Sequence, residues 1–173
     1  MSLRNLTLVL LLVLPMGFCK AQSATARPVE PTAIGIIYHL ASASNEFKKL
    51  PDEQWKQASH ITGMNTMTYS IQVSRDRSSF RLKVGDKLEF VFKTGSPEKV
   101  SLYRFDQKSN KRRFDYEKGH GRNGDSGLEP IKGLPVEVSK FGESSYQLVP
   151  ASPLTPGEYA IMIAEEAYTF GVD

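Results

Sequence analysis

Cysteine is nearly absent from this sequence, with Cys19 the single example among 173 residues. Cys19 lies in an N-terminal segment that we expect to be removed on export, so the mature chain has no thiol. This excludes a disulfide framework, a thiolate metal site and a cysteine nucleophile. Lipidation of Cys19 is the alternative, but bacterial lipobox sequences have a small residue before the cysteine, and Phe18 is bulky. We therefore expect the hydrophobic core alone to stabilise the mature chain.

Long apolar runs are also scarce, and the only one spans residues 6–14. Arg4 precedes this run, and Cys19 and Ala21 place small residues at the −3 and −1 positions of a cleavage site. This arrangement is typical of a cleaved signal peptide. The run is well short of the ~18–20 residues that a bilayer-spanning helix needs. We therefore predict a signal peptide at 1–21, a periplasmic or secreted protein, and no transmembrane segment after cleavage.

The chain also lacks an excess of charge of one sign. Removing residues 1–21 takes two of the 22 basic residues and none of the 19 acidic ones, so the mature chain is almost neutral. Basic residues are nevertheless concentrated between 99 and 122. We predict an exposed basic hairpin tip that favours an anionic envelope component or a partner protein, with an ordinary solvated tip as the alternative. Its candidate binding residues are Lys108, Lys111, Arg112 and Arg113.

Aromatic residues interleave with this basic stretch, as they do in proteins that bind single-stranded nucleic acid. On strands, however, Tyr103 and Phe105 share a face, and so do Phe114 and Tyr116. This is the pattern of a stripe that faces the core. Because of this pattern and the expected export, we predict that nucleic acid is not a partner. Trp55 is likewise expected to cover the edge of the core rather than to serve as a ligand platform.

Residues 148–161 are the most informative about the fold. They indicate the end of one strand, a Pro-rich crossing, and Tyr159 placed two residues into the next strand. This matches the tyrosine corner of immunoglobulin-like sandwiches, in which the hydroxyl bonds back to upstream backbone. We therefore predict a structural role for Tyr159 and strands E, F and G of such a sandwich at Ser145–Val149, Glu158–Ala164 and Tyr168–Val172.

Short strands separated by turns recur along the chain, which is typical of an all-β sandwich. We predict an immunoglobulin-like antiparallel β-sandwich at 67–173, preceded at 27–66 by a small hairpin and a short helix. The helical turn is expected over Pro51–Gln57, because acids crowd its first turn and Pro51 stops the preceding strand. Val100–Phe105 is expected to pair with Arg113–Glu117 across a polar turn.

Residues that could do catalysis form no known constellation. Gly124–Gly127 matches the start of the nucleophile segment of chymotrypsin-like proteases, but Leu128 replaces the glycine that should follow, and no histidine segment matches. Glu165 and Glu166 are adjacent at an expected hairpin tip, where two carboxylates are ordinarily solvated. We predict no catalytic residues and no enzyme activity.

His60, Met64 and Met67 form the best candidate for a metal site. An imidazole and two thioethers outside the cytoplasm are soft ligands that suit copper(I). Their spacing matches no established motif, and the alternative interpretation is that Met67 simply opens the next strand. A copper-binding or small-ligand protein is therefore the second hypothesis for function, and otherwise no cofactor is expected.

The segment from Pro153 to Ala160 (PLTPGEYA), followed by the terminal Phe170–Asp173 (FGVD), resembles a signature shared by uncharacterised exported bacterial proteins. Residues 35–51 resemble the N-terminal hairpin of the same group. The resemblance implies bacterial origin and export, and it brings no assigned catalytic residue. Together with the fold, it leads us to expect an exported, non-enzymatic domain that recognises an envelope component or a partner protein.

Overall fold

More than half of the described residues lie in β-strands; the computed structural model describes residues 29–62, 66–108, 110–120 and 126–173. Within these residues there is no α-helix, and the 3₁₀ turn η1 (Pro97–Lys99) is the only helical element. The strands are β1 (Ile37–Ala41), β2 (Glu46–Lys49), β3 (Trp55–Thr62), β4 (Thr66–Ser74), β5 (Arg81–Leu82), β6 (Phe90–Phe92), β7 (Ser101–Arg104), β8 (Asp106–Lys108), β9 (Lys111–His120), β10 (Ser126–Pro130), β11 (Val136–Phe141), β12 (Ser145–Pro150), β13 (Gly157–Ile163) and β14 (Glu166–Val172).

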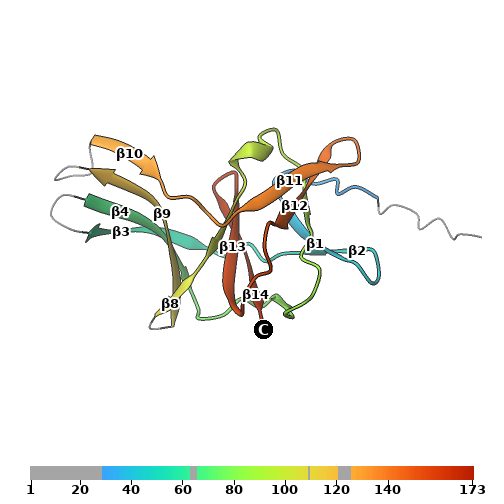
Figure 1. Ribbon diagram of the computed structural model, residues 1–173, viewed down its shortest axis with the longest axis horizontal. Helices are drawn as coiled ribbons and strands as arrows, with labels where there is room; N and C mark the ends of the chain where they lie inside the picture. The colour runs from blue at the N-terminus through green and yellow to red at the C-terminus, as the bar shows by residue number, and fades with distance from the viewer. Residues whose placement is uncertain (1–28, 63–65, 109, 121–125) are drawn as a thin grey trace, which may run out of the picture.

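Two of the sheets form a sandwich (Figure 1). The first has the strand order β11-β12-β6-β1-β2, and the second has the order β5-β14-β13-β7. When β1, β6, β7, β11, β12, β13 and β14 are taken as strands A to G, the sheets read D-E-B-A and G-F-C. This is the strand arrangement of the immunoglobulin fold. The predicted all-β sandwich is confirmed, and the predicted E, F and G strands correspond to β12, β13 and β14.

One pairing differs from the predicted antiparallel arrangement. β5 runs parallel to β14, with Arg81 opposite Gly171 and Leu82 opposite Val172. A tight hairpin forces its two strands to be antiparallel, whereas a long connection does not. No tight hairpin joins β5 to β14, because β5 follows the β3–β4 excursion in the chain. The two strands can therefore pair in parallel.

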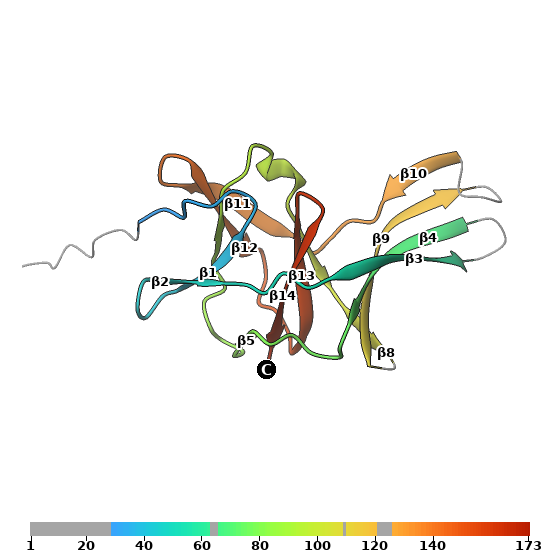
Figure 2. The same cartoon turned by 180° about the vertical axis from the view of Figure 1, so that it is seen from behind.

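A third sheet, which we call the outer sheet, lies beside the sandwich and projects away from it (Figures 1 and 2). Its strand order is β10-β9-β4-β3, and β8 also pairs with β9. Two excursions build it: β3 and β4 are inserted between β2 and β5, and β8 to β10 between β7 and β11. The predicted division near residue 66 does not correspond to a division in the fold, because β1 pairs with β6 inside the sandwich and β4 belongs to the outer sheet.

The predicted short helix at Pro51–Gln57 is wrong. Asp52 forms a β-bridge with Tyr168, and β3 begins at Trp55. All eight residues of β3 pair with β4 in continuous register. An isolated helix shorter than ~12–15 residues is marginal in water, so the ladder of pairing with β4 determines the local structure.

The predicted pairing of Val100–Phe105 with Arg113–Glu117 is also wrong. The strand is interrupted at Phe105. As a result, β7 pairs with β13 in the sandwich, and β8 pairs with β9 in the outer sheet. At the break, the Phe105 N–H donates to the Glu158 carbonyl at 2.9 Å. The sequence pattern correctly indicates strand residues here, but it does not indicate that the chain passes from one sheet to another.

β13 is buried on both faces because it lies between two layers. Tyr159, Ile161 and Ile163 pack into the core between the two sheets of the sandwich. The alternating residues Ala160 and Met162 pack instead against a second apolar cluster under the outer sheet. Successive side chains on a strand point to opposite faces, so β13 packs against both layers at once.

The tyrosine corner predicted from the sequence is present. The Tyr159 hydroxyl donates to the Thr155 carbonyl at 2.6 Å, and the residue is 1% exposed. Its ring stacks on Phe170 with centroids 5.4 Å apart. The corner therefore fixes the Pro-rich crossing between β12 and β13.

Candidate binding site

The predicted basic tip is not one exposed patch. Lys108 and Lys111 are exposed and Arg113 is partly exposed, but Arg112 is 0% exposed. Neighbouring side chains on β9 alternate between faces, so Arg112 points under the outer sheet while Lys111 and Arg113 point away from it. The prediction that all four residues form an accessible binding patch is therefore wrong for Arg112.

Arg112 lies in a buried ion-pair cluster that joins the outer sheet to the sandwich. Its guanidinium pairs with Glu53 and with Glu158, the latter at 3.3 Å between Nη1 and Oε2. Its Nε donates to the Arg75 carbonyl at 3.2 Å. Glu158, on β13, also pairs with Arg81. Two arginines and two glutamates thus neutralise one another, which is the condition for burying charge.

Hydroxyls and backbone complete the hydrogen bonding of this cluster. The Ser78 N–H donates to Glu158 Oε2 at 2.7 Å, and the Thr169 hydroxyl donates to Glu53 Oε1 at 2.7 Å. Arg81 extends the cluster to Asp173, and hydrogen bonding to Arg81 lowers the pKa of that carboxyl. Because every charged group has a partner, the cluster has the character of a structural clamp rather than of a catalytic centre.

The candidate copper ligands do not converge. Met64 lies outside the described residues. His60 is opposite Thr68 in the β3–β4 ladder, whereas Met67 is opposite Ile61, so His60 and Met67 lie on opposite faces of the outer sheet. His60 Nδ1 is 3.5 Å from the Ser70 hydroxyl, and Nε2 is 4.0 Å from Asp115. In the described part of the chain, no three histidine, cysteine, aspartate or glutamate residues are placed to hold a metal ion.

An aromatic cleft opens between the outer sheet and the second sheet of the sandwich. Its volume is about 420 Å³. Residues from β3, β4 and β9 form one wall, and residues from η1, β7 and the β13–β14 hairpin form the other. The cleft is lined by Trp55, Gln57, Ile71, Lys99, Ser101, Tyr103, Tyr116, Met162 and Glu165.

The aromatic residues of the cleft are held in place by specific contacts. The Trp55 indole N–H donates to the Glu165 carbonyl at 3.1 Å, which ties β3 to the tip of the β13–β14 hairpin. Tyr103 stacks on Phe114 with centroids 4.4 Å apart and an interplanar angle of 12°. Tyr116 is the extra residue of a β-bulge in β9, opposite the Tyr69–Ser70 step. A bulge re-aims a side chain, and here it brings Tyr116 to the cleft.

The chemistry of the cleft is suited to binding. Burial raises the pKa of Tyr103 and of Tyr116, so both phenols stay protonated and neutral. Lys99 and Glu165 supply one charge of each sign at the lining. A pocket that is mainly apolar, with a few polar groups, is the usual form of a ligand site.

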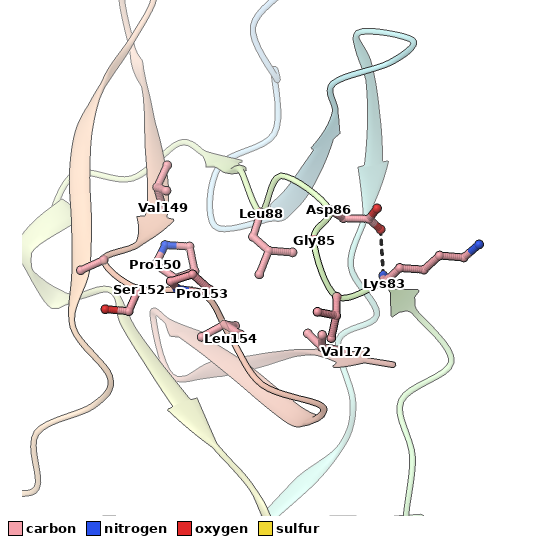
Figure 3. Close-up of a pocket in the computed structure, with 12 residues that line it drawn as sticks. Lys83, Gly85, Asp86, Leu88, Val149, Pro150, Ser152, Pro153, Leu154 and Val172 are labelled. Atoms are coloured by element: carbon pink, nitrogen blue, oxygen red, sulfur yellow. Dashed lines mark hydrogen bonds between the residues drawn. The ribbon is translucent and has the colours of Figure 1, made fainter.

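A second hollow lies at one end of the sandwich, between the turn at residues 83–88 and the Pro-rich crossing (Figure 3). It measures about 300 Å³, and Leu88, Val149 and Leu154 form its apolar wall. The Asp86 carboxylate accepts the Lys83 N–H at 2.8 Å and so closes the turn. Its one acid is therefore committed to local structure.

A third cavity, of about 520 Å³, contains a buried histidine in its wall. His39 is 6% exposed and lies between the rings of Phe80 and Phe90. Its Nε2 is 3.3 Å from the Lys87 carbonyl, which makes Nε2 the protonated nitrogen. Its Nδ1 has no hydrogen-bond partner among the described residues. Burial lowers the pKa of His39, and the bond to Lys87 offsets this only in part.

We expect His39 to make the protein less stable in mild acid. A folded-state pKa below the ordinary ~6.5 means that the unfolded chain binds the proton more strongly. The free energy of unfolding should therefore fall as the pH drops below about 6.5. In His39→Gln, urea melts at pH 7 and pH 5 should show a smaller loss than in the wild type. Equal losses in the two proteins would show that His39 does not titrate differently on folding.

Comparisons with known proteins bring no assignment. No family model matches the chain, and searches of curated proteins and of solved structures found no match. The resemblance to exported bacterial proteins therefore stays a prediction. Among the described residues, no helix has the length and apolar character needed to cross a membrane.

Sequence reasoning missed the cleft although it identified several of its residues. Trp55 does pack against the apolar cluster, as predicted, but it also lines the cleft. Phe105 and Phe114 are buried as the core-facing stripe predicts, whereas Tyr103 and Tyr116 are only partly buried. The single available signal was the phenol of each tyrosine, which favours a position at the edge of a core.

Proposed function

We propose that this protein is an exported, non-enzymatic binding protein that recognises an envelope component or a partner protein in the aromatic cleft. The cleft carries the proposal, because three aromatic residues from different elements converge there on a space of about 420 Å³. Trp and Tyr are enriched at binding hot spots, where their rings supply large contact areas. The predicted signal peptide supports a location outside the cytoplasm.

The basic tip contributes less to this proposal than the sequence suggested. Lys108 and Lys111 are left as exposed basic residues, and Arg113 is 3.7 Å from Asp115. Isolated exposed charges contribute little to affinity and are screened by salt. The cleft replaces the tip as the main candidate surface.

A small-ligand protein is the second candidate function. Ligand pockets commonly measure about 300–1,000 Å³, and the cleft lies within this range. The copper form of this hypothesis loses its basis, because His60 and Met67 lie on opposite faces.

The proposal predicts that cleft variants lose the ligand while the fold survives. The immobilised mature protein should retain one or more components of a bacterial envelope fraction. Tyr116→Ser should weaken that retention by about 2 kcal/mol, or roughly 30-fold. Gln57→Tyr, which fills the cleft without removing a buried group, should weaken it as well. Each retained component is then titrated into the protein while the fluorescence emission of Trp55, the only tryptophan in the chain, is recorded.

Lys118→Ser is the matched control. Lys118 is two residues from Tyr116 on β9, is partly exposed and pairs with Glu129 at 3.1 Å on the opposite face of the sheet. This variant should bind as the wild type does. If Tyr116→Ser and Gln57→Tyr still retain the components and Lys118→Ser does not, the binding site lies outside the cleft.

A further inference from the structure

The two edges of the outer sheet differ in how they are protected from further pairing. β10 has a β-bulge between Ser126 and Leu128 and ends at Pro130, two features that block strand addition. β3 has neither: its eight residues pair with β4 without a break in register and include no proline. Lys56 is its only lysine or arginine, and it has no acid. β3 is thus a long, regular edge strand on which Lys56 is the single charged residue.

The other described edges are short, charged or covered. β5 and β8 have two and three residues. β2 and β11 carry charged side chains along their length. The outer side of β7 is bridged where Leu102 pairs with Leu134. Among the described strands, β3 therefore has the longest open edge, with one charged residue against the two of β11, Glu137 and Lys140.

The cleft face of β3 has Gln57 and Ser59 between Trp55 and Ile61, and beyond them an apolar row crosses the outer sheet from Ile61. Trp55 and Gln57 line the cleft, and Ile61 shares their face because side chains two residues apart point the same way. Ile61 is 70% exposed. It stands opposite Met67, which stands opposite Gly119, which stands opposite Leu128. A strand added to β3 would place alternate side chains beside this row and into the mouth of the cleft.

Lys56 favours one acidic side chain in the partner, because it lies on the face of β3 that points away from the cleft and its Glu165. No salt bridge of the described residues involves Lys56, on the polar face of β3, or Lys99, at the cleft. Residues of an incoming strand that alternate with its apolar ones would lie on the Lys56 side. Acidic residues at those positions would complement it.

From these observations we infer that β3 binds an extended peptide segment of a partner protein, added as a strand at the edge of the outer sheet. Alternate side chains of the segment lie over the cleft face of β3, where apolar ones contact Trp55 and Ile61, and an acidic side chain on the other face meets Lys56. Backbone hydrogen bonds supply affinity in this mode of recognition, and the alternate side chains supply specificity. The inference rests on the proposed function and names its partner class.

A random linear dodecapeptide library displayed on phage, selected on the full mature protein, tests this inference. Selected peptides should carry apolar residues at alternate positions with acidic residues between them. Binding of the synthetic peptide should shift Trp55 emission and slow amide hydrogen exchange in β3. Peptides with apolar residues spaced as on a helix, or no enrichment at all, would contradict the inference.

Two complementary N-methylated forms of the selected peptide separate strand addition from side-chain capture. Successive backbone N–H groups of a strand point to opposite sides, so only one alternate set faces β3. Methylation of that set should weaken binding by about tenfold or more, since each lost hydrogen bond contributes about 1 kcal/mol. Methylation of the other set should leave affinity unchanged. Equal affinities of the two forms would overturn strand addition.

Variants of the protein then locate the contact. Ile61→Ser should weaken binding, whereas Leu128→Ser, at the opposite edge of the same row, should not. If Tyr116→Ser abolishes binding while β3 exchange is unaffected by peptide, strand addition is wrong and the cleft proposal stands. If neither the peptide nor envelope components shift Trp55, both are wrong. If β3 is protected without peptide and the protein is dimeric, a second copy occupies the edge and the inference is overturned.

Discussion

Replacing Arg112 by alanine is expected to destabilise the protein by about 3–5 kcal/mol, the usual effect of removing one member of a buried ion pair. Arg112 is fully buried, and its loss leaves Glu53 without its cationic partner and Glu158 with Arg81 alone. The outer sheet would lose its buried ionic attachment to the sandwich. Urea melts followed by far-UV circular dichroism measure the change.

The adjacent residue provides the control for this experiment. Lys111→Ala alters an exposed side chain one position away and should change stability by no more than ~0.5 kcal/mol. Arg112→Lys should be intermediate, because it keeps the charge but cannot make the separate contacts of the guanidinium. Similar melts for Arg112→Ala and Lys111→Ala would mean that the buried cluster does not contribute to stability.

Tyr159→Ala is the second change with a large expected effect, a loss of about 3–5 kcal/mol, as for other large buried aromatics. Tyr159 is buried, stacks on Phe170 and anchors the crossing from β12 to β13. Tyr159→Phe removes only the hydroxyl and its bond to the Thr155 carbonyl. It should lower the free energy of unfolding by about 1 kcal/mol.

The pair of Tyr159 variants separates packing from hydrogen bonding, and both are read from the midpoint of a urea melt. The m-value should be unchanged in Tyr159→Phe, since the surface exposed on unfolding is the same. A phenylalanine variant as stable as the wild type would show that the hydroxyl bond contributes nothing net. The corner would then act by ring packing alone.

The sandwich could be predicted because its strongest signals are local. The Pro-rich crossing and the tyrosine after it lie within residues 148–161, and the E, F and G strands are separated by short turns. The outer sheet could not be predicted, because β4 and β9 meet across about 45 residues of chain, as with Ser70 opposite Asp115. Alternation along a strand indicates that a residue is on a face, but not which sheet that face belongs to.

The binding site could not be predicted from the sequence for the same reason. Arg112 looks like its neighbours Lys111 and Arg113, and only the register of β9 shows that it is buried. The cleft depends on the bulge at Tyr116 and on the meeting of Trp55 with Glu165, 110 positions apart. Neither the bulge nor this contact produces a recognisable pattern in the local sequence.

The sequence signature at the end of the chain has a structural explanation. Glu158 enters the buried cluster and Tyr159 makes the corner. Phe170 and Val172 are core residues, and Arg81 lies over Gly171 so closely that a Cβ there would collide with its guanidinium. Asp173 pairs with Arg77 and Arg81. These two segments therefore contribute to the closure of the fold, and a fold by itself does not specify a chemistry.

The position of the outer sheet has a consequence for how the native protein opens. Both the outer sheet and the sandwich join distant parts of the chain, since Ser70 lies opposite Asp115 and Arg104 opposite Tyr159. They differ in burial, because no residue of β3 is buried whereas β13 is buried on both faces. We therefore expect the outer sheet to open before the sandwich does. Its amides should exchange faster than those of β13 in the native protein.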